Sequence, residues 1–188
     1  MPASVLARWP DAGSTCSVAL PRKLGGRLTR FADQPTVEVR SSIGAPPEVV
    51  WTYVTDINIS AKFQDEFLEA EWIDDGPALG SRFRGKNAAG SRAWETTCTI
   101  IGFEPNRLLA WAVNDVENPA ATWTFSLEDA GDGTTLVYHR VVGPGPSGLT
   151  HAIDKYPDRE EEFVDARDDQ HRQHMQAVVD GIKHLAEA

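Results

Sequence analysis

The sequence is poor in the residues that build disulfide-rich or metal-dependent proteins. It contains only two cysteines, Cys16 and Cys98. They form neither a disulfide framework nor the spacing of a metal site. This pattern is typical of a reducing compartment, so we expect a cytoplasmic location. The sequence also lacks an apolar run long enough to span a bilayer, and we expect no membrane insertion.

Nucleotide-binding and nucleophile motifs are missing as well. No phosphate-cradling glycine loop, dinucleotide fingerprint or serine nucleophile elbow occurs in the chain. Lys and Arg number 18 against 28 Asp and Glu, which gives a net charge of −10. Such an excess of negative charge disfavours nucleic acids and anionic membrane surfaces as partners. We therefore expect no cofactor and no nucleic-acid partner.

The first segment, residues 1–35, differs in composition from the rest of the chain. Proline, glycine, serine and threonine are frequent there, and no hydrophobic periodicity holds. The segment lacks the charged start and apolar core of a signal peptide. We expect an extension that is loosely ordered or wraps the surface. Residues 36–188 have the usual size of one domain.

The remainder of the chain has the pattern of an antiparallel sheet. Residues 36–43 alternate between apolar and polar side chains, which predicts a half-buried strand. Two short helices are expected next, at 47–54 and 59–66. Alternation and frequent turn residues then predict six further strands, at 68–74, 80–87, 92–103, 107–114, 122–128 and 134–142. Residues 143–157 begin with Gly143-Pro144-Gly145-Pro146, and we expect a loop there.

The last long stretch, residues 159–187, is predicted to be one helix. It contains no proline, and three glutamates lie near its start, where the helix dipole favours acidic groups. A helical wheel gives it an apolar stripe comprising Phe163, Val164, Met175, Val178, Ile182 and Leu185. Arg167, His171 and His174 fall on the same stripe. Two interpretations stay open: these three side chains line a wet or ligand-filled space, or they lie at the stripe's edge and reach water.

These elements together predict an α+β fold. A seven-stranded antiparallel sheet has one face that needs cover, and only the C-terminal helix is long enough to provide it. We expect a curved sheet wrapped around this long helix, with two short helices after the first strand. Curved sheets of this kind often hold a ligand between sheet and helix.

Several stretches resemble a known superfamily. They are VEVRSSI at 37–43, APPEVVW at 45–51, GSRFRG at 80–85 with Asn87, and WETTCTI at 94–100 before Glu104-Pro105. They resemble the polyketide cyclase/dehydrase and lipid-transfer superfamily (START-related, SRPBCC, birch-pollen-allergen-like). The resemblance covers residues 36–142 and the last helix by position, and it implies the helix-grip fold. The superfamily contains aromatase/cyclases, lipid and hormone binders and chaperone activators, so fold does not fix function.

Strand parity selects the side chains that should face the helix. The expected ligand-binding residues are Phe83, Asn87, Trp94, Thr96, Trp111, Trp123 and Phe125 on strands, with Arg167 and Met175 on the helix. They describe an aromatic-walled pocket with a few convergent polar groups, which is the usual site for a hydrophobic small molecule.

A cyclase interpretation gives chemical roles to four polar side chains. His171 or His174 would remove an α-proton, because imidazole titrates near neutral pH. Arg140 or Tyr138 would stabilise the developing enolate or alkoxide. In the alternative interpretation, Arg140 pairs with an acidic residue and Tyr138 is a plain wall residue. The two histidines could form half of a metal site, but without a third ligand we expect no metal.

Three functions stay open at this point. The first is a cyclase/dehydratase-like enzyme of natural-product biosynthesis. The second is a non-catalytic carrier or sensor of a hydrophobic small molecule or lipid, which needs only the aromatic walls. The third is a protein-interaction module, which a large exposed apolar patch would favour. In each case we expect a monomer or a homodimer.

Overall fold

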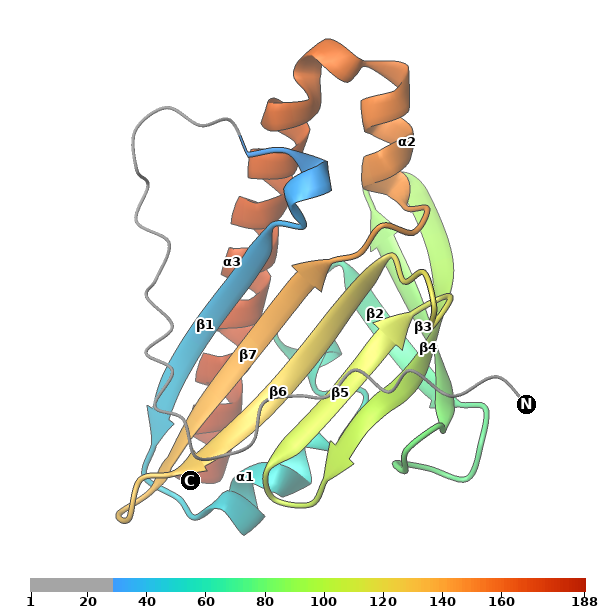
Figure 1. The fold of residues 1–188 in the computed structure, drawn as a ribbon. Helices are drawn as coiled ribbons and strands as arrows, with labels where there is room; N and C mark the ends of the chain where they lie inside the picture. The colour runs from blue at the N-terminus through green and yellow to red at the C-terminus, as the bar shows by residue number, and fades with distance from the viewer. Residues whose placement is uncertain (1–28) are drawn as a thin grey trace, which may run out of the picture.

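The computed structural model describes residues 29–188 (Figure 1). The strands are β1 (Thr36–Ile43), β2 (Phe67–Trp72), β3 (Arg82–Ala89), β4 (Arg92–Glu104), β5 (Leu108–Val113), β6 (Ala121–Asp129) and β7 (Thr134–Val142). The helices are α1 (Pro47–Val54), α2 (Gly148–Lys155) and α3 (Glu160–Ala186), with short 3₁₀ turns η1 (Phe31–Asp33), η2 (Ser60–Lys62) and η3 (Pro157–Arg159). Most of the predicted extension, residues 1–28, lies outside the described residues, so that prediction is untested.

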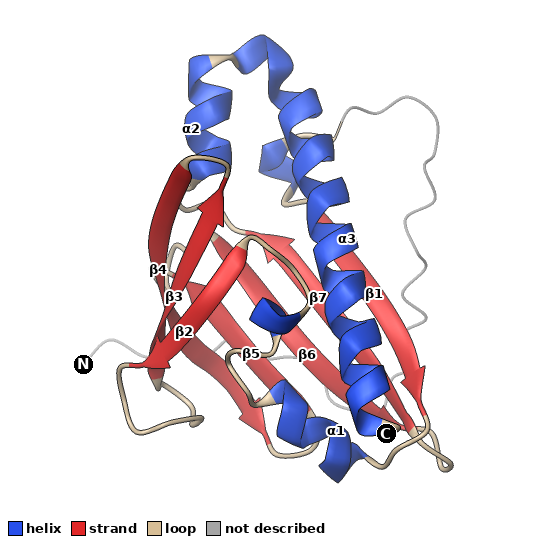
Figure 2. Cartoon of the chain, turned by 180° about the vertical axis from the view of Figure 1, so that it is seen from behind, coloured by secondary structure: helices blue, strands red, loops and turns tan. Residues whose placement is uncertain are grey.

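The seven strands form one antiparallel sheet in the order β1-β7-β6-β5-β4-β3-β2. Figure 2 shows that the sheet curves around α3, which crosses its concave face. A register shift between Ile100 and Gly102 marks a bulge in β4, and a bulge bends its strand and increases the local twist. Gly102 suits this bend, because a Cβ there would lie 2.7 Å from Leu108 Cδ2. The predicted helix-grip architecture is confirmed.

The hydrophobic core lies between the C-terminal half of α3, the sheet and α1. Val178 and Ile182 of α3 are almost fully buried, as are Val37 of β1 and Val50 and Val54 of α1. This packing follows from the apolar stripe, whose spacing places its members on one face of the helix. The C-terminal half of α3 therefore packs the hydrophobic core. The middle of the helix faces the remaining part of the concave surface of the sheet.

The second predicted short helix, 59–66, is wrong in its extent, because only η2 forms there. The side chain of Gln64 ends it: its Oε1 accepts the backbone N–H groups of Glu66 at 2.7 Å and Phe67 at 3.0 Å. A side chain that bonds nearby backbone amides offers the chain an alternative to the helix. Residues 64–66 consequently turn the chain into β2.

The prediction of a loop over 143–157 is also wrong, since this segment contains α2 and the first residue of η3. Ser147 and Thr150 form a reciprocal cap at the start of α2. The Thr150 N–H donates to Ser147 Oγ at 3.2 Å, and the Ser147 N–H donates to Thr150 Oγ1 at 2.7 Å. The usual form of this box has Glu or Gln in the second position. Here Thr150 occupies that position, and the box directly follows a Gly/Pro run. The sequence therefore gave only a weak signal for the start of a helix.

Gly181 of α3 lies directly under the ring of Phe63, and a Cβ at this position would overlap that ring. In an exposed helix, replacing Gly by Ala stabilises by roughly 1 kcal/mol. Here we expect Gly181→Ala to lower the free energy of unfolding by about 1–2 kcal/mol, because the ring must move. Urea unfolding measures the change. Phe63→Leu in the same background should restore most of the loss, and a stabilised single variant would contradict this packing.

Candidate functional site

A cavity of about 750 Å³ lies between the concave face of the sheet and α3. Its volume falls within the range of small-molecule pockets. All thirteen side chains selected from the sequence line it: Phe83, Asn87, Trp94, Thr96, Trp111, Trp123, Phe125, Tyr138, Arg140, Arg167, His171, His174 and Met175. Exposed lining residues on the β3–β4 hairpin and on α3, such as Arg92 and Ala166, mark its opening. The roles of these residues in binding or catalysis are untested predictions.

Aromatic rings from neighbouring strands form one wall of the cavity. Trp111 and Trp123 pair across β5 and β6, with nearly parallel rings whose centroids are 6.4 Å apart. Phe125 and Tyr138 pair across β6 and β7 and stack at 4.0 Å. Residues directly opposite each other in an antiparallel pair share one face of the sheet. The four rings therefore make a continuous apolar surface that suits an aromatic or conjugated ligand.

Arg140 of β7 forms the polar part of the wall, although it is only 1% exposed. One terminal nitrogen, Nη2, donates to the carboxylate of Asp168, and Nη1 donates to Nδ1 of His171 at 2.8 Å. Arg140 therefore pairs with an acidic residue, as the alternative interpretation expects, and its role in the site remains a prediction. Among residues 29–188, however, the buried Arg140 Nε–H has no hydrogen-bond partner. A buried donor without an acceptor costs about 1–3 kcal/mol.

His171 of α3 is buried beside Arg140 and forms an edge-to-face contact with Trp123. Burial, together with the positive charges of Arg167 and Arg140, lowers the pKa of His171 well below its ordinary value of 6.5. The imidazole is therefore neutral near neutral pH. Because Nδ1 accepts a hydrogen bond from Arg140, the ring hydrogen is assigned to Nε2. This geometry favours His171 as a hydrogen-bond donor over a role as a base.

Acidification should destabilise the fold through His171. Below pH 6.5 the unfolded state binds a proton at this residue and the folded state does not, because the folded-state pKa is lower. The free energy of unfolding should therefore fall by up to about 1.4 kcal/mol per pH unit until the folded-state pKa is reached. In His171→Asn, which keeps an acceptor for Arg140 but cannot be protonated, the slope should be flatter.

Urea unfolding at pH values above and below 6.5 measures this slope. Burial also lowers the pKa of His139, which is less buried than His171. His139→Asn should therefore remove a smaller part of the slope. An identical slope in His171→Asn and the wild type would contradict the assignment of a buried neutral imidazole.

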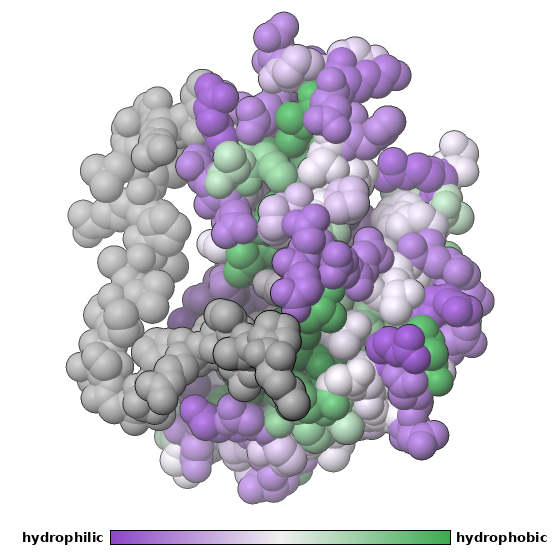
Figure 3. All heavy atoms as spheres, turned by 45° about the vertical axis from the view of Figure 1, so that its right-hand side comes forward, coloured by the Kyte–Doolittle hydropathy of each residue, from purple (hydrophilic) through white to green (hydrophobic). Residues whose placement is uncertain are grey.

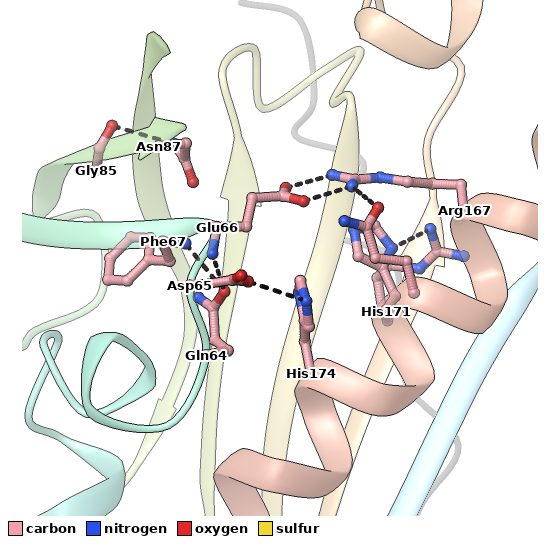
Figure 4. Close-up of polar contacts among 11 residues, drawn as sticks. Gln64, Asp65, Glu66, Phe67, Gly85, Asn87, Arg167, His171 and His174 are labelled. Atoms are coloured by element: carbon pink, nitrogen blue, oxygen red, sulfur yellow. Dashed lines mark hydrogen bonds and ion pairs between the residues drawn. The ribbon is translucent and has the colours of Figure 1, made fainter. Parts of the chain in front are cut away.

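Arg167 and His174 contact the loop that precedes β2, as Figure 4 shows. Both terminal nitrogens of Arg167 donate to the carboxylate of Glu66 at 2.6 Å. Nε2 of His174 lies 3.5 Å from Oδ1 of Asp65, whose side chain is almost fully exposed. Of the two interpretations of the stripe on α3, the geometry supports the one in which its polar middle lines a cavity.

Two further cavity residues have shifted pKa values. Burial raises the pKa of the Tyr138 hydroxyl, although a hydrogen bond with Ser60 opposes the shift. Burial raises the pKa of the Cys98 thiol to about 12. Both groups are therefore protonated near neutral pH, and Cys98 is an inert wall residue rather than a nucleophile.

Sequence reasoning missed the acidic partners of the site, Glu66 and Asp168. Asp168 lies three residues before His171, a spacing that places the two on neighbouring positions of one helical face. That spacing was a signal that could have been used. Glu66 gave no such signal, because it lies in a segment predicted to be helical and its partner Arg167 is 101 positions away.

Among residues 29–188, the face in Figure 3 shows no broad apolar patch of the kind that favours a protein-interaction module. On the face in Figure 3, the described residues are mostly hydrophilic, and hydrophobic residues appear in narrow groups rather than one broad patch. The most exposed large apolar side chains include Leu79 and Leu68, at 70% and 51%. Within the described part of the chain, no helix is long and apolar enough to cross a membrane.

Comparison with known proteins agrees with this fold. Residues 34–157 match the family model for polyketide cyclase/dehydrase and lipid transport. The Polyketide_cyc-like protein Cgl2372 from Corynebacterium glutamicum is 29% identical, with 81% of this chain and 91% of that chain covered and a TM-score of 0.61. None of the curated proteins shows a significant match.

Two more distant solved structures share the fold alone. The Zhui aromatase/cyclase from Streptomyces sp. R1128 is 17% identical, with 82% and 94% of the two chains covered and a TM-score of 0.57. The ginseng major latex-like protein 151 from Panax ginseng is 8% identical, with 82% and 99% covered and a TM-score of 0.55.

Proposed function

The chain belongs to the polyketide cyclase/dehydrase and lipid transport family, and from this premise we propose that it binds an apolar carbonyl compound in its cavity and catalyses an intramolecular aldol condensation. The observation that carries the proposal is the buried Arg140 Nε–H without a partner among the described residues, beside an aromatic wall. This nitrogen has almost no accessible surface when the cavity is empty, so a small shift of the guanidinium would bring a ligand oxygen into hydrogen-bond distance and satisfy the donor. The rings would bind the rest of the ligand. The aromatase/cyclase named among the similar folds supports the reaction class.

The proposed reaction is redox-neutral and requires no cofactor. His174 accepts a proton from a carbon next to a carbonyl group, and the electron pair of that C–H bond forms an enolate. The enolate carbon attacks a second carbonyl carbon, a C–C bond forms, and the resulting alkoxide takes the proton back from His174. Loss of this hydroxyl group with a neighbouring proton, as water, then gives a C=C bond.

The cavity residues divide the remaining roles. Asp65, 3.5 Å from His174, stabilises the imidazolium that forms after proton abstraction. The Arg140 and His171 N–H donors stabilise the developing oxyanion, as buried preorganised donors do in other acyl and enolate chemistry. The stacked rings of Trp111, Trp123, Phe125 and Tyr138 hold the substrate in a folded geometry, which supplies much of the acceleration.

An aryl methyl diketone with three methylene groups between its carbonyls tests this function. Its aldol condensation gives a phenyl-substituted cyclohexenone, which is followed by ultraviolet absorbance. We expect the protein to accelerate both ring closure and deuterium exchange at the α-carbons in heavy water, with saturation at high diketone concentration. A diketone that binds but is recovered unexchanged and uncyclised would refute the catalytic proposal.

A non-catalytic carrier or sensor of a hydrophobic small molecule is the second candidate. It is favoured by one observation: the two arginines at the polar end of the cavity already pair with carboxylates, the buried Arg140 with Asp168 and the partly exposed Arg167 with Glu66. This function predicts micromolar or tighter affinity, with the ligand recovered unchanged. Native mass spectrometry of the purified protein, followed by extraction under denaturing conditions, would identify such a ligand.

A further inference from the structure

The two arginines at the polar end of the cavity are each matched by a carboxylate. Arg140 pairs with Asp168, and Arg167 pairs with Glu66 through both of its terminal nitrogens. His171, which lies between them, is neutral near neutral pH because burial lowers its pKa. The two ion pairs thus carry no net charge, although the region contains two guanidinium groups.

The other charged residues of the cavity wall do not change this balance. Asp56 pairs with Lys62, and Glu95 lies 3.9 Å from Arg84. Arg92 lies over the ring of Trp94 at the exposed β3–β4 hairpin. Two exposed residues of α3, Arg172 and Asp165, act on the pKa of Asp168 through space in opposite directions. Among the described groups that line the cavity, a ligand at the buried end therefore meets no uncompensated positive charge.

Arg140 also offers a limited set of donors. Its two terminal nitrogens are engaged by His171 and Asp168, and Nε is the nitrogen without a partner among the described residues. Arginine binds carboxylates through paired N–H groups and through its charge. A ketone or hydroxyl oxygen, by contrast, needs one donor and no countercharge. A carboxylate buried here would lose its hydration without gaining a net positive partner.

We propose that Asp168 sets the specificity of the cavity: by neutralising Arg140 it selects ligands whose buried end is an uncharged carbonyl or hydroxyl oxygen, and it excludes carboxylates such as fatty acids. The proposal rests on the proposed function in one respect, the use of this cavity as the ligand site. Asp168 acts through Arg140 and is therefore a positioning residue.

Asp168→Asn removes the charge and keeps a side-chain oxygen that can accept the hydrogen bond from Arg140 Nη2. The guanidinium is then an unmatched charge in a region of low dielectric, where a ligand carboxylate can neutralise it. Asp168→Asn should therefore shift the preference of the cavity towards carboxylates. Asp169→Asn is the matched control, because it removes the same charge from the adjacent, exposed position of α3.

Methyl naphthyl ketone and naphthoate form a matched probe pair, and neither can undergo ring closure, so binding is measured without turnover. In titrations followed by tryptophan fluorescence, the wild type should bind the ketone at least about 10-fold more tightly than naphthoate. Asp168→Asn should bind naphthoate at least about 10-fold more tightly than the wild type does, with the ketone affinity changed by less than about 3-fold. Asp169→Asn should match the wild type for both probes.

Equal affinities of the wild type for the two probes, or an unchanged ratio of the two affinities in a folded Asp168→Asn variant, would overturn the proposal.

A second measurement does not depend on any variant. In the wild type, the apparent affinity for naphthoate should rise as the pH is lowered towards the pKa of the ligand, because its neutral acid fits the cavity; a constant or falling affinity would overturn the proposal too. The diketone assay tests catalysis, whereas these titrations test whether the cavity selects ligands by charge. Failure of the proposed function and failure of the Asp168 proposal are therefore distinguishable.

Discussion

Replacing Arg140 by methionine should lower the free energy of unfolding by about 3 kcal/mol, near the low end of the range for breaking a buried ion pair. The substitution leaves Asp168, whose side chain is 16% exposed, without its cation and His171 Nδ1 without its donor. Methionine fills much of the volume of the arginine stem, so the loss reports on charge and hydrogen bonding more than on packing.

Two further variants identify the source of this loss. In Arg140→Met/Asp168→Leu both charges are absent, and most of the lost stability should return. Arg84→Met removes one member of an ion pair with Glu71 that is exposed on both sides, and should cost less than about 1 kcal/mol. Urea unfolding of the set gives the comparison. A loss in Arg140→Met no larger than that in Arg84→Met would contradict the assignment of a buried charge pair.

Replacing His174 by glutamine should slow α-proton exchange and ring closure of the diketone by roughly 10²–10⁴-fold, the range expected when a general base is removed. Affinity for methyl naphthyl ketone should change by less than about 3-fold, because the aromatic wall and Arg140 are untouched. The substitution should affect catalysis and not binding, because the two depend on different residues. His174 faces Asp65, whereas the donor functions reside in Arg140 and His171.

His139→Gln is the matched control for this experiment. His139 precedes Arg140 on β7, so its side chain points to the opposite face of the sheet. We expect wild-type exchange and ring closure in this variant. Exchange at the wild-type rate in His174→Gln, with the fold intact, would show that another group removes the proton.

Much of the fold could be predicted from the sequence because it depends on local patterns. Alternation with a period of two, together with regularly spaced turn residues, identified the seven strands, and strand parity placed Trp111, Trp123 and Tyr138 on the cavity side. Strand ends were less accurate. The strand predicted at 80–87 is Arg82–Ala89, since Gly80 has a positive φ and Asp74 bonds both the backbone and the side chain of Arg82.

The chemistry of the site was harder to predict because it depends on long-range pairing. The contact between Glu66 and Arg167 joins positions 101 apart and depends on where the curved sheet brings the loop before β2. The donor role favoured for His171 depends on which ring nitrogen faces Arg140, and a helical wheel does not contain that information. The sequence therefore predicted which side chains line the cavity. The protonated nitrogen of His171 and the ion-pair partners of the arginines required the three-dimensional structure.

The most direct test of the account is the NMR signal of the Arg140 Nε–H group during titration with methyl naphthyl ketone, in protein labelled with ¹⁵N. This hydrogen has no acceptor among the described residues, so a ligand carbonyl that bonds to it should move its proton signal downfield. The indole N–H signals of Trp111 and Trp123 should shift with the same saturation curve, and Arg140→Met assigns the arginine signal. Saturable ketone binding that leaves these three signals in place would contradict the claim that the cavity holds the ligand with its oxygen at Arg140.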